Sequence, residues 1–194
     1  MPLLDRSDSL LIVIDAQPGF CGSAAVQDSE AASRSRDVAA WLAGVAIALD
    51  VPVVVTEEDP ARNGRTDPVI LGRLPPGKAA LVKPVFGLAD VPEILAAVEA
   101  TGRRTAVLVG CETDVCVGQS AIGLVDRGYR VLVVSDATFA PGAMHDLGLR
   151  RIREQGGEVG HAKGVYYEWL RTLDAAVRFE AEHPDLAAPP GFSL

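Results

Sequence analysis

One stretch of the chain, residues 107–117, has residue types and spacing that suit covalent catalysis. It begins with an apolar run that favours a buried parallel strand, and Gly110 ends this run. Thr113 or Asp114 is placed to cap a helix that follows, so Cys116 falls in the first turn of that helix. Unpaired N–H groups and the helix dipole stabilise a thiolate there, and the same groups bind an oxyanion that develops on a substrate. The pattern predicts a nucleophilic cysteine; the alternative is a buried cysteine that packs as a small hydrophobe.

Two other residues capable of chemistry also follow apolar runs. Asp15 comes directly after residues 10–14, and Lys83 comes directly after residues 79–82. Ligands of open α/β sheets bind at the carboxyl ends of the strands. We therefore expect Asp15, Lys83 and Cys116 to share one small cavity at that edge of a sheet. Taken singly, a capping aspartate and a solvated lysine are the alternatives.

Strand-like apolar runs alternate along the chain with helix-like apolar patterns, and these indicate the elements that must position the three side chains. Apolar runs of strand length predict strands at residues 10–14, 51–56, 79–82, 107–109, 130–134 and 158–160. Helical spacing of apolar residues predicts helices at residues 31–49, 89–100, 143–155 and 166–182, and one from Cys116 to Gly128. Residues 17–22 are rich in turn residues and predict a loop. This alternation indicates the α/β class: a three-layer fold with a mostly parallel sheet and helices on both faces.

Length and charge limit the class of protein further. With 194 residues the chain fits a single domain, residues 1–194, and we expect its Pro-rich tail at residues 184–194 to be mobile. The net charge of -8 argues against non-specific binding to nucleic acid or to an anionic membrane surface. Residues 1–8 lack the basic segment of a signal peptide, and the apolar run at residues 10–14 is too short to span a membrane.

The three cysteines, Cys21, Cys111 and Cys116, show no CxxC spacing and cannot all be paired within one chain. Reduced thiols in a cytoplasm are the simplest interpretation. A helix first turn near the ammonium group of Lys83 predicts that Cys116 is far more reactive to alkylation than the other two. Cys111 ends a buried strand, and Cys21 is expected in a loop without a cation nearby in sequence.

No cofactor or metal site is predicted. His145, His161 and His183 have no His or Cys partner at the spacing that zinc ligands require. Neither a dinucleotide-binding glycine motif nor a Walker loop occurs. Residues 57–59 form a carboxylate cluster after a strand, which we interpret as solvated loop charge because no His lies near it.

Two segments favour a homo-oligomer. Residues 61–78 form a long stretch without clear periodicity, and such loops often pack against a partner. Residues 166–170 carry three aromatic side chains, a type enriched at interfaces. The alternative for these aromatic residues is packing against their own sheet.

The chain order of Asp15, Lys83 and Cys116 resembles that of the isochorismatase-like cysteine hydrolases, an α/β superfamily. The resemblance covers most of the chain, from about Leu10 to Trp169. The matching stretches are residues 12–17 with Phe20, residues 82–84, and residues 110–117, of which the last is the most specific. The resemblance implies a small-molecule substrate and a cis peptide bond between Cys111 and Glu112.

One departure from the superfamily narrows the activity. Its nicotinamidases hold a metal with an Asp-x-His motif and a further His soon after the second strand. Residues 56–59 contain no His, and none occurs before His145, so nicotinamidase activity is not expected. Enzymes that act on the vinyl ether of isochorismate can lack the cysteine. The presence of Cys116 therefore favours carbonyl chemistry.

The resemblance implies cleavage of a small amide or ureide C–N bond through a thioester. Asp15 takes the thiol proton of Cys116, and Lys83 helps to hold both anions in place. The backbone N–H groups of Glu112 and Cys116 bind the oxyanion of the tetrahedral intermediate. Because the three side chains share protons, any pKa values would belong to the group.

The chain also offers residues that could line a substrate pocket, and it leaves other functions open. Gln17, Phe20 and Phe86 are expected to contact the substrate. Vinyl ether hydrolysis, with Asp15 as the acid and Cys116 dispensable, is one alternative. A non-catalytic oligomeric binding protein of the same fold is another, and a redox role for Cys116 also stays open.

Overall fold

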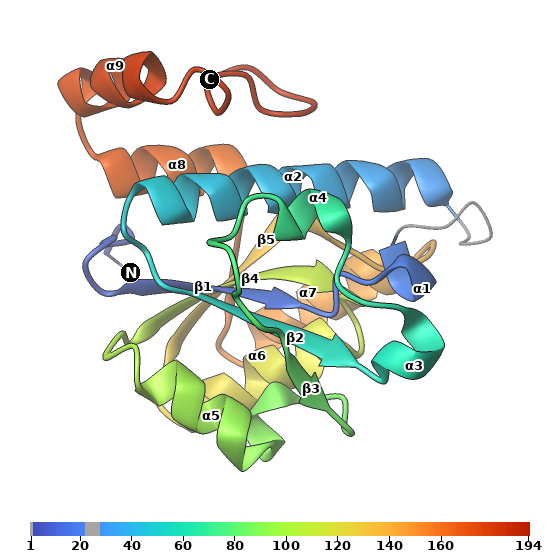
Figure 1. Cartoon of the computed structure of the whole chain (residues 1–194). Helices are drawn as coiled ribbons and strands as arrows, with labels where there is room; N and C mark the ends of the chain where they lie inside the picture. The colour runs from blue at the N-terminus through green and yellow to red at the C-terminus, as the bar shows by residue number, and fades with distance from the viewer. Residues whose placement is uncertain (1, 22–27) are drawn as a thin grey trace.

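The computed structural model describes residues 2–21 and 28–194, in which helices pack on both faces of a central sheet (Figure 1). Within these residues six strands pair in the order β3-β2-β1-β4-β5-β6, and every neighbouring pair is parallel. The strands are β1 (Ser9–Ile14), β2 (Val53–Glu58), β3 (Leu81–Lys83), β4 (Thr105–Cys111), β5 (Arg130–Phe139) and β6 (Glu158–Gly160). The predicted three-layer α/β fold is confirmed.

The helices form the two outer layers. Helices α2 (Ser29–Ala48) and α8 (Ala162–Leu170) cover one face, and α5 (Pro92–Glu99), α6 (Cys116–Asp126) and α7 (Met144–Glu154) cover the other (Figure 1). The remaining elements are α1 (Pro18–Cys21), α3 (Pro60–Asn63), α4 (Pro68–Leu71), the 3₁₀ turn η1 (Leu88–Asp90) and α9 (Leu173–Glu182). Among the described residues, no helix combines the length and the apolar character that a membrane crossing demands.

The strands read as continuous apolar runs because both of their faces are buried. In β1, Leu11 and Val13 enter the core beneath α2 and α8, whereas Ile12 and Ile14 enter the core beneath α5, α6 and α7. All six residues of this strand are buried. The alternation of side chains across the sheet thus divides the hydrophobic residues between two cores and fixes the register of each strand.

Several boundaries differ from the sequence prediction. Strand β2 runs to Glu58 because residues 56–58 pair with β3, and β5 runs to Phe139 beside β4. The predicted helix at residues 166–182 is two helices, because Arg171 takes a left-handed φ of 70° and the Thr172 side chain caps α9. The predicted loop at residues 17–22 contains α1. Gly22 and Met1 lie outside the described residues.

The C-terminal tail packs onto the fold, whereas the sequence suggested a mobile segment. Leu186 is buried, and its carbonyl oxygen accepts a hydrogen bond of 2.8 Å from the Trp41 indole N–H. The ring of Phe192 meets the ring of Trp41 edge-on, with centroids 5.4 Å apart. These contacts hold the tail against α2.

The chain direction creates a crevice at the carboxyl ends of β1 and β4. The chain builds β2 and β3 on one side of β1, then returns to place β4 on its other side and continues outward. Such a reversal of strand order is where ligands of open α/β sheets bind. Gly110 permits the close pairing here: its φ is 116°, and a Cβ atom would overlap the carbonyl oxygen of Ile14.

Candidate active site

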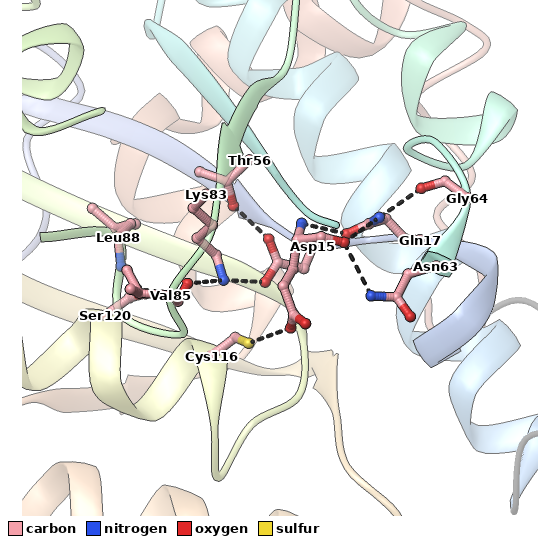
Figure 2. A network of polar contacts seen from close by, with 11 residues as sticks. Asp15, Gln17, Thr56, Asn63, Gly64, Lys83, Val85, Leu88, Cys116 and Ser120 are labelled. Carbon is pink, nitrogen blue, oxygen red and sulfur yellow. Dashed lines mark hydrogen bonds and ion pairs between the residues drawn. The ribbon is translucent and has the colours of Figure 1, made fainter. Parts of the chain in front are cut away.

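The carboxyl ends of three strands place Asp15, Lys83 and Cys116 close together. Asp15 follows β1, Lys83 is the last residue of β3, and Cys116 is the first residue of α6, after β4. Lys83 Nζ lies 2.6 Å from Asp15 Oδ2, and neither side chain is exposed to solvent. The three side chains point toward one another (Figure 2). The structure therefore brings together all three residues that the sequence analysis selected for chemistry.

Asp15 is held by contacts on both sides. Its backbone has a left-handed φ of 46°, and its Oδ1 accepts a hydrogen bond of 2.8 Å from the Thr56 hydroxyl (Figure 2). Burial raises the pKa of Asp15, although the charge of Lys83 and the hydrogen bonds from Lys83, Thr56 and Cys116 oppose this rise. A carboxylate with a raised pKa is a stronger base than an ordinary aspartate, which suits proton transfer.

The Cys116 thiol differs from the stabilised thiolate that the sequence predicted. It is only 3% exposed, and burial together with the negative charges of Asp15 and Glu58 raises its pKa, against the opposing charge of Lys83. Helix α6 starts as predicted, but its N-cap residue is Val115, without a side-chain cap from Thr113 or Asp114. The thiol therefore stays protonated until a neighbouring base accepts its proton.

Glu58 is a site residue that the sequence analysis missed. Its Oε2 lies 3.5 Å from Cys116 Sγ, so the interpretation of residues 57–59 as solvated loop charge is wrong for this residue. It is also wrong for Glu57, which is 2% exposed and accepts hydrogen bonds from the backbone and hydroxyl of Thr66. Both belong to β2, which is longer than predicted, so their side chains alternate between opposite faces of the sheet.

Gln17 bonds to the backbone beside the site, and its buried side chain does not reach a cavity that could hold a substrate. Its amide donates to the carbonyl oxygens of Glu58 and Gly64, at 2.9 and 2.6 Å, and its Oε1 accepts from the Glu58 N–H at 2.7 Å (Figure 2). With its amide engaged and its side chain buried, the expected substrate contact is replaced by a structural one. Phe20 likewise packs against the α2 core.

A cavity of about 660 Å³ opens beside the site. Glu58, Asp59, Lys83 and Phe86, which is 50% exposed, are among the residues that line it, whereas Asp15 and Cys116 are not. The contact of Phe86 with a substrate stays a prediction. Another hollow, of about 740 Å³ between the start of α2 and the end of β5, contains none of the three reactive side chains.

The backbone around Cys116 carries unused donors. Within the described residues, the N–H groups of Glu112 and Cys116 donate no hydrogen bond, whereas the neighbouring Val115 and Val117 N–H groups both donate to the Glu112 carbonyl. The peptide bond between Cys111 and Glu112 is cis, as the resemblance implied. Both free donors belong to the segment that runs from Glu112 to Cys116, so they are available to bind an oxyanion that forms on a substrate.

Asp15, Glu58 and Cys116 offer donor atoms that lie within 4.8 Å of one another, a spacing that a metal ion can bridge. The ammonium group of Lys83 already contacts Asp15 at 2.6 Å and supplies the positive charge that an ion would bring. The donor set therefore fits proton transfer better than metal binding. The absence of a metal stays a prediction.

The other two cysteines belong to the core on the opposite face of the sheet from α6. Cys21 and Cys111 are each 1% exposed, and both belong to the α2 core. Cys21 lies at the end of α1 and not in an exposed loop, which corrects the expectation for this residue. Burial raises the pKa of the Cys111 thiol. All three thiols are free.

Comparison with known families agrees with this fold and site. The family model described as the Isochorismatase domain matches residues 9–163. Because this match covers most of the chain, the protein belongs to the isochorismatase family of hydrolases. The chain is 42% identical over 91 residues to Isochorismatase domain-containing protein 1 of Danio rerio, a match that covers 46% of the chain and 31% of the relative. The matched region thus spans about a third of that relative.

Longer matches cover nearly the whole chain. The chain is 25% identical over 190 residues to the probable hydrolase YcaC of Escherichia coli, covering 94% of the chain and 89% of the relative. The crystal structure of that protein, described as an octameric hydrolase of unknown specificity, superposes with a TM-score of 0.82 over 96% of this chain and 93% of the other, at 22% identity. A cysteine hydrolase from Pseudomonas syringae pv. phaseolicola gives a TM-score of 0.71 at 19% identity, over 87% and 97% of the two chains.

Proposed function

We propose that this hydrolase cleaves the C–N bond of a small amide or ureide through a thioester on Cys116. The observation that carries the proposal is the buried Asp15–Lys83 ion pair of 2.6 Å beside a thiol at the start of α6. The N–H groups of Glu112 and Cys116, in the segment that ends at this thiol, donate no hydrogen bond among the described residues. A base, a nucleophile and an oxyanion hole are the three parts that acyl transfer needs.

The first half-reaction forms the thioester. Asp15 accepts the Cys116 thiol proton as the sulfur attacks the substrate carbonyl carbon, and the C=O electron pair moves onto oxygen. The N–H groups of Glu112 and Cys116 bind that oxyanion. The intermediate then collapses, the C–N bond breaks, and Asp15 returns its proton to the leaving nitrogen. Lys83 keeps a positive charge beside whichever group is anionic.

The second half-reaction releases the acid. Water attacks the thioester carbonyl and gives a proton to Asp15, and the same N–H groups bind the second oxyanion. Collapse breaks the C–S bond, and the sulfur takes its proton back from Asp15. The sum is amide plus water to carboxylic acid plus amine. Because burial raises the pKa of both Asp15 and Cys116, the proton stays within the cluster between these steps.

A panel of small amides and ureides, assayed for ammonia release, tests this proposal. Wild-type protein should hydrolyse at least one member of the panel, and Cys116→Ala should lose essentially all of that activity. Acid quenching during turnover should trap an acyl group on Cys116, detectable by peptide mass spectrometry and removable with hydroxylamine. Cys116→Ala that retains full activity would eliminate the thioester mechanism.

The same variant separates the rival functions. Vinyl ether hydrolysis with Asp15 as the acid does not need a thiol, so Cys116→Ala would stay active on isochorismate. A non-catalytic binding protein would show no turnover with either class of substrate and no acyl adduct. Neither rival gives a role to the two free N–H donors on Glu112 and Cys116.

We also propose that the chain forms a homo-oligomer in a reducing compartment such as the cytoplasm. The octameric state described for the E. coli relative supports the first part. Tyr166 and Trp169 are buried in their own core, so the interface predicted at residues 166–170 is wrong for these side chains. The predicted loop at residues 61–78 contains α4, in which Val69 and Leu71 are exposed and apolar and remain available for an interface. Light scattering at micromolar concentration gives the mass in solution.

A further inference from the structure

We propose that Glu58 makes the site selective for substrates with a positive charge or several N–H donors beside the scissile carbonyl, and against anionic substrates. The inference deepens the proposed function and rests on it. It assigns a recognition role to a carboxylate that the hydrolytic steps above do not use. Three properties of Glu58 produce this selectivity: its position beside the thiol, the lack of a cation that neutralises it, and the negative charge of its neighbours.

The first property is position. Glu58 Oε2 lies 3.5 Å from Cys116 Sγ, so a group bonded to the carbonyl carbon under attack lies within reach of this carboxylate. Its backbone is fixed on both sides. Gln17 accepts from its N–H and donates to its carbonyl oxygen, and the Asn63 amide donates to the same oxygen at 3.0 Å. A side chain on so rigid a support can select a substrate by geometry.

The second property is the missing counterion. Throughout residues 2–21 and 28–194, no Lys, Arg or His side chain forms an ion pair with Glu58 or with Asp59. Lys83 is engaged by Asp15 at 2.6 Å and by the carbonyl oxygen of Val85 at 3.1 Å. Arg65 pairs with Glu57.

The third property is the charge of the neighbourhood. The pKa of Glu112 is raised by burial and by the negative charges of Asp114 and Glu58, so these carboxylates lie close enough to repel one another. Asp59 lines the cavity together with Glu58, and Lys83, the one cation among its lining residues, is paired with Asp15, so the cavity carries an excess of negative charge. In a cleft with low-dielectric walls such charges focus the field on the ligand.

The chemistry of recognition follows from these properties. An ammonium, amidinium or ureide N–H group next to the carbonyl can donate charge-assisted hydrogen bonds to Glu58 while Cys116 attacks. A carboxylate at the same place would meet Glu58 without a free cation to compensate it. The site therefore disfavours isochorismate-like substrates, which carry carboxylates, independently of the role of the thiol.

Charge-matched thiol reagents test the selectivity without requiring a known substrate. The probes are methanethiosulfonates with a trimethylammonioethyl, a methyl or a sulfonatoethyl group. In each case the Cys116 thiolate attacks the sulfenyl sulfur, a mixed disulfide forms and methanesulfinate leaves. Rates at Cys116 are measured by peptide mass spectrometry at low salt and divided by the rates with free 2-mercaptoethanol.

We expect the normalised rate for the cationic probe to exceed that for the anionic probe by on the order of tenfold or more, with the neutral probe between them. Glu58→Gln should reduce this ratio several-fold. Glu99→Gln removes the same charge from an exposed position at the end of α5 and should leave the ratio unchanged. A ratio of one or below, a ratio unaffected by Glu58→Gln, or failure of every probe to reach Cys116 would overturn the proposal.

A parallel assay separates this inference from the proposed function. Ammonia release is compared for glycinamide, propionamide and malonamate, which carry positive, zero and negative charge. Preference for the cation, reduced in Glu58→Gln, supports both proposals. If no amide or ureide is hydrolysed, the proposed function fails, and the ratio of labelling rates still decides whether the site selects cations. Hydrolysis that favours malonamate contradicts the inference and leaves the function intact.

Discussion

Lys83 Nζ lies 2.6 Å from Asp15 Oδ2, and both side chains are completely removed from solvent. Two opposite charges at this separation stabilise each other, but each has lost its hydration. Neither can therefore be removed alone without leaving a buried, uncompensated charge. This dependence gives the site a stability signature that can be measured apart from activity.

Lys83→Met should lower the free energy of unfolding by about 3–5 kcal/mol, because it leaves Asp15 buried without a counterion. Urea denaturation at neutral pH measures the change. The double variant Asp15→Asn/Lys83→Met should recover most of this stability and remain inactive. Arg73→Met, which breaks the partly exposed pair with Asp185, serves as the control and should cost at most about 1 kcal/mol. Equal losses in the two single variants would contradict this account of the ion pair.

Asp15→Asn should increase the rate at which iodoacetamide alkylates Cys116 by about an order of magnitude while abolishing hydrolysis. The charge of Asp15 raises the pKa of the thiol and that of Lys83 lowers it, so removing Asp15 favours the thiolate. Labelling at neutral pH, followed by peptide mass spectrometry, measures the rate. Cys21 is buried and provides an internal reference. Slower alkylation in the variant would mean that Asp15 activates the thiol even without substrate.

Gly110→Ala should cost more than about 4 kcal/mol or prevent folding, because the new Cβ would overlap the Ile14 carbonyl oxygen between β1 and β4. Gly102→Ala is the matched control. Its φ of 68° is also left-handed, but nothing lies within 4 Å of the added atom, so only about 1–2 kcal/mol of backbone strain is expected. Thermal or urea unfolding of both variants distinguishes collision from strain.

Glu112→Gln should stabilise the protein at neutral pH. Burial and the charges of Asp114 and Glu58 raise the folded-state pKa of Glu112 above its ordinary value of 4.5. A raised pKa means that the folded protein binds this proton more tightly than the unfolded chain does. The resulting stability is present below pH 4.5 and is lost as the pH rises through the folded-state pKa. Wild type and variant should therefore unfold at similar urea concentrations near pH 4 and diverge toward pH 7, with wild type the weaker.

Removal of metal should not affect the reaction. The ammonium group of Lys83 contacts Asp15 and supplies the positive charge that an ion bridging Asp15, Glu58 and Cys116 would bring. Protein dialysed against a chelator should keep its activity toward any amide found in the panel. Elemental analysis should find less than one metal ion per chain. Activity that tracks a stoichiometric ion would reverse this prediction.

Local sequence was sufficient to select three side chains that the structure brings together. Asp15, Lys83 and Cys116 each end or follow an apolar run, and parallel strands bring such positions to one edge of the sheet. The burial of β1 and β4 was equally evident, because strands covered on both faces read as unbroken apolar runs. Gly110 marked the end of one of these runs, and its left-handed φ explains why glycine stands there.

Only the tertiary structure determined that Glu58 lies beside Cys116 and that the pKa of the Cys116 thiol is raised. Strand β2 extends to Glu58 because Glu58 pairs with Lys83, a partner 25 positions later in the chain, and local periodicity does not report such pairing. Gln17, a predicted substrate ligand, instead bonds through its side-chain amide to the backbone of Glu58. The thiol pKa is raised by burial and by carboxylates that other strands supply, and neither can be read from the local sequence around Cys116. Position along the chain determines which residue types reach the site, whereas the charges that surround them depend on strand pairing between distant segments.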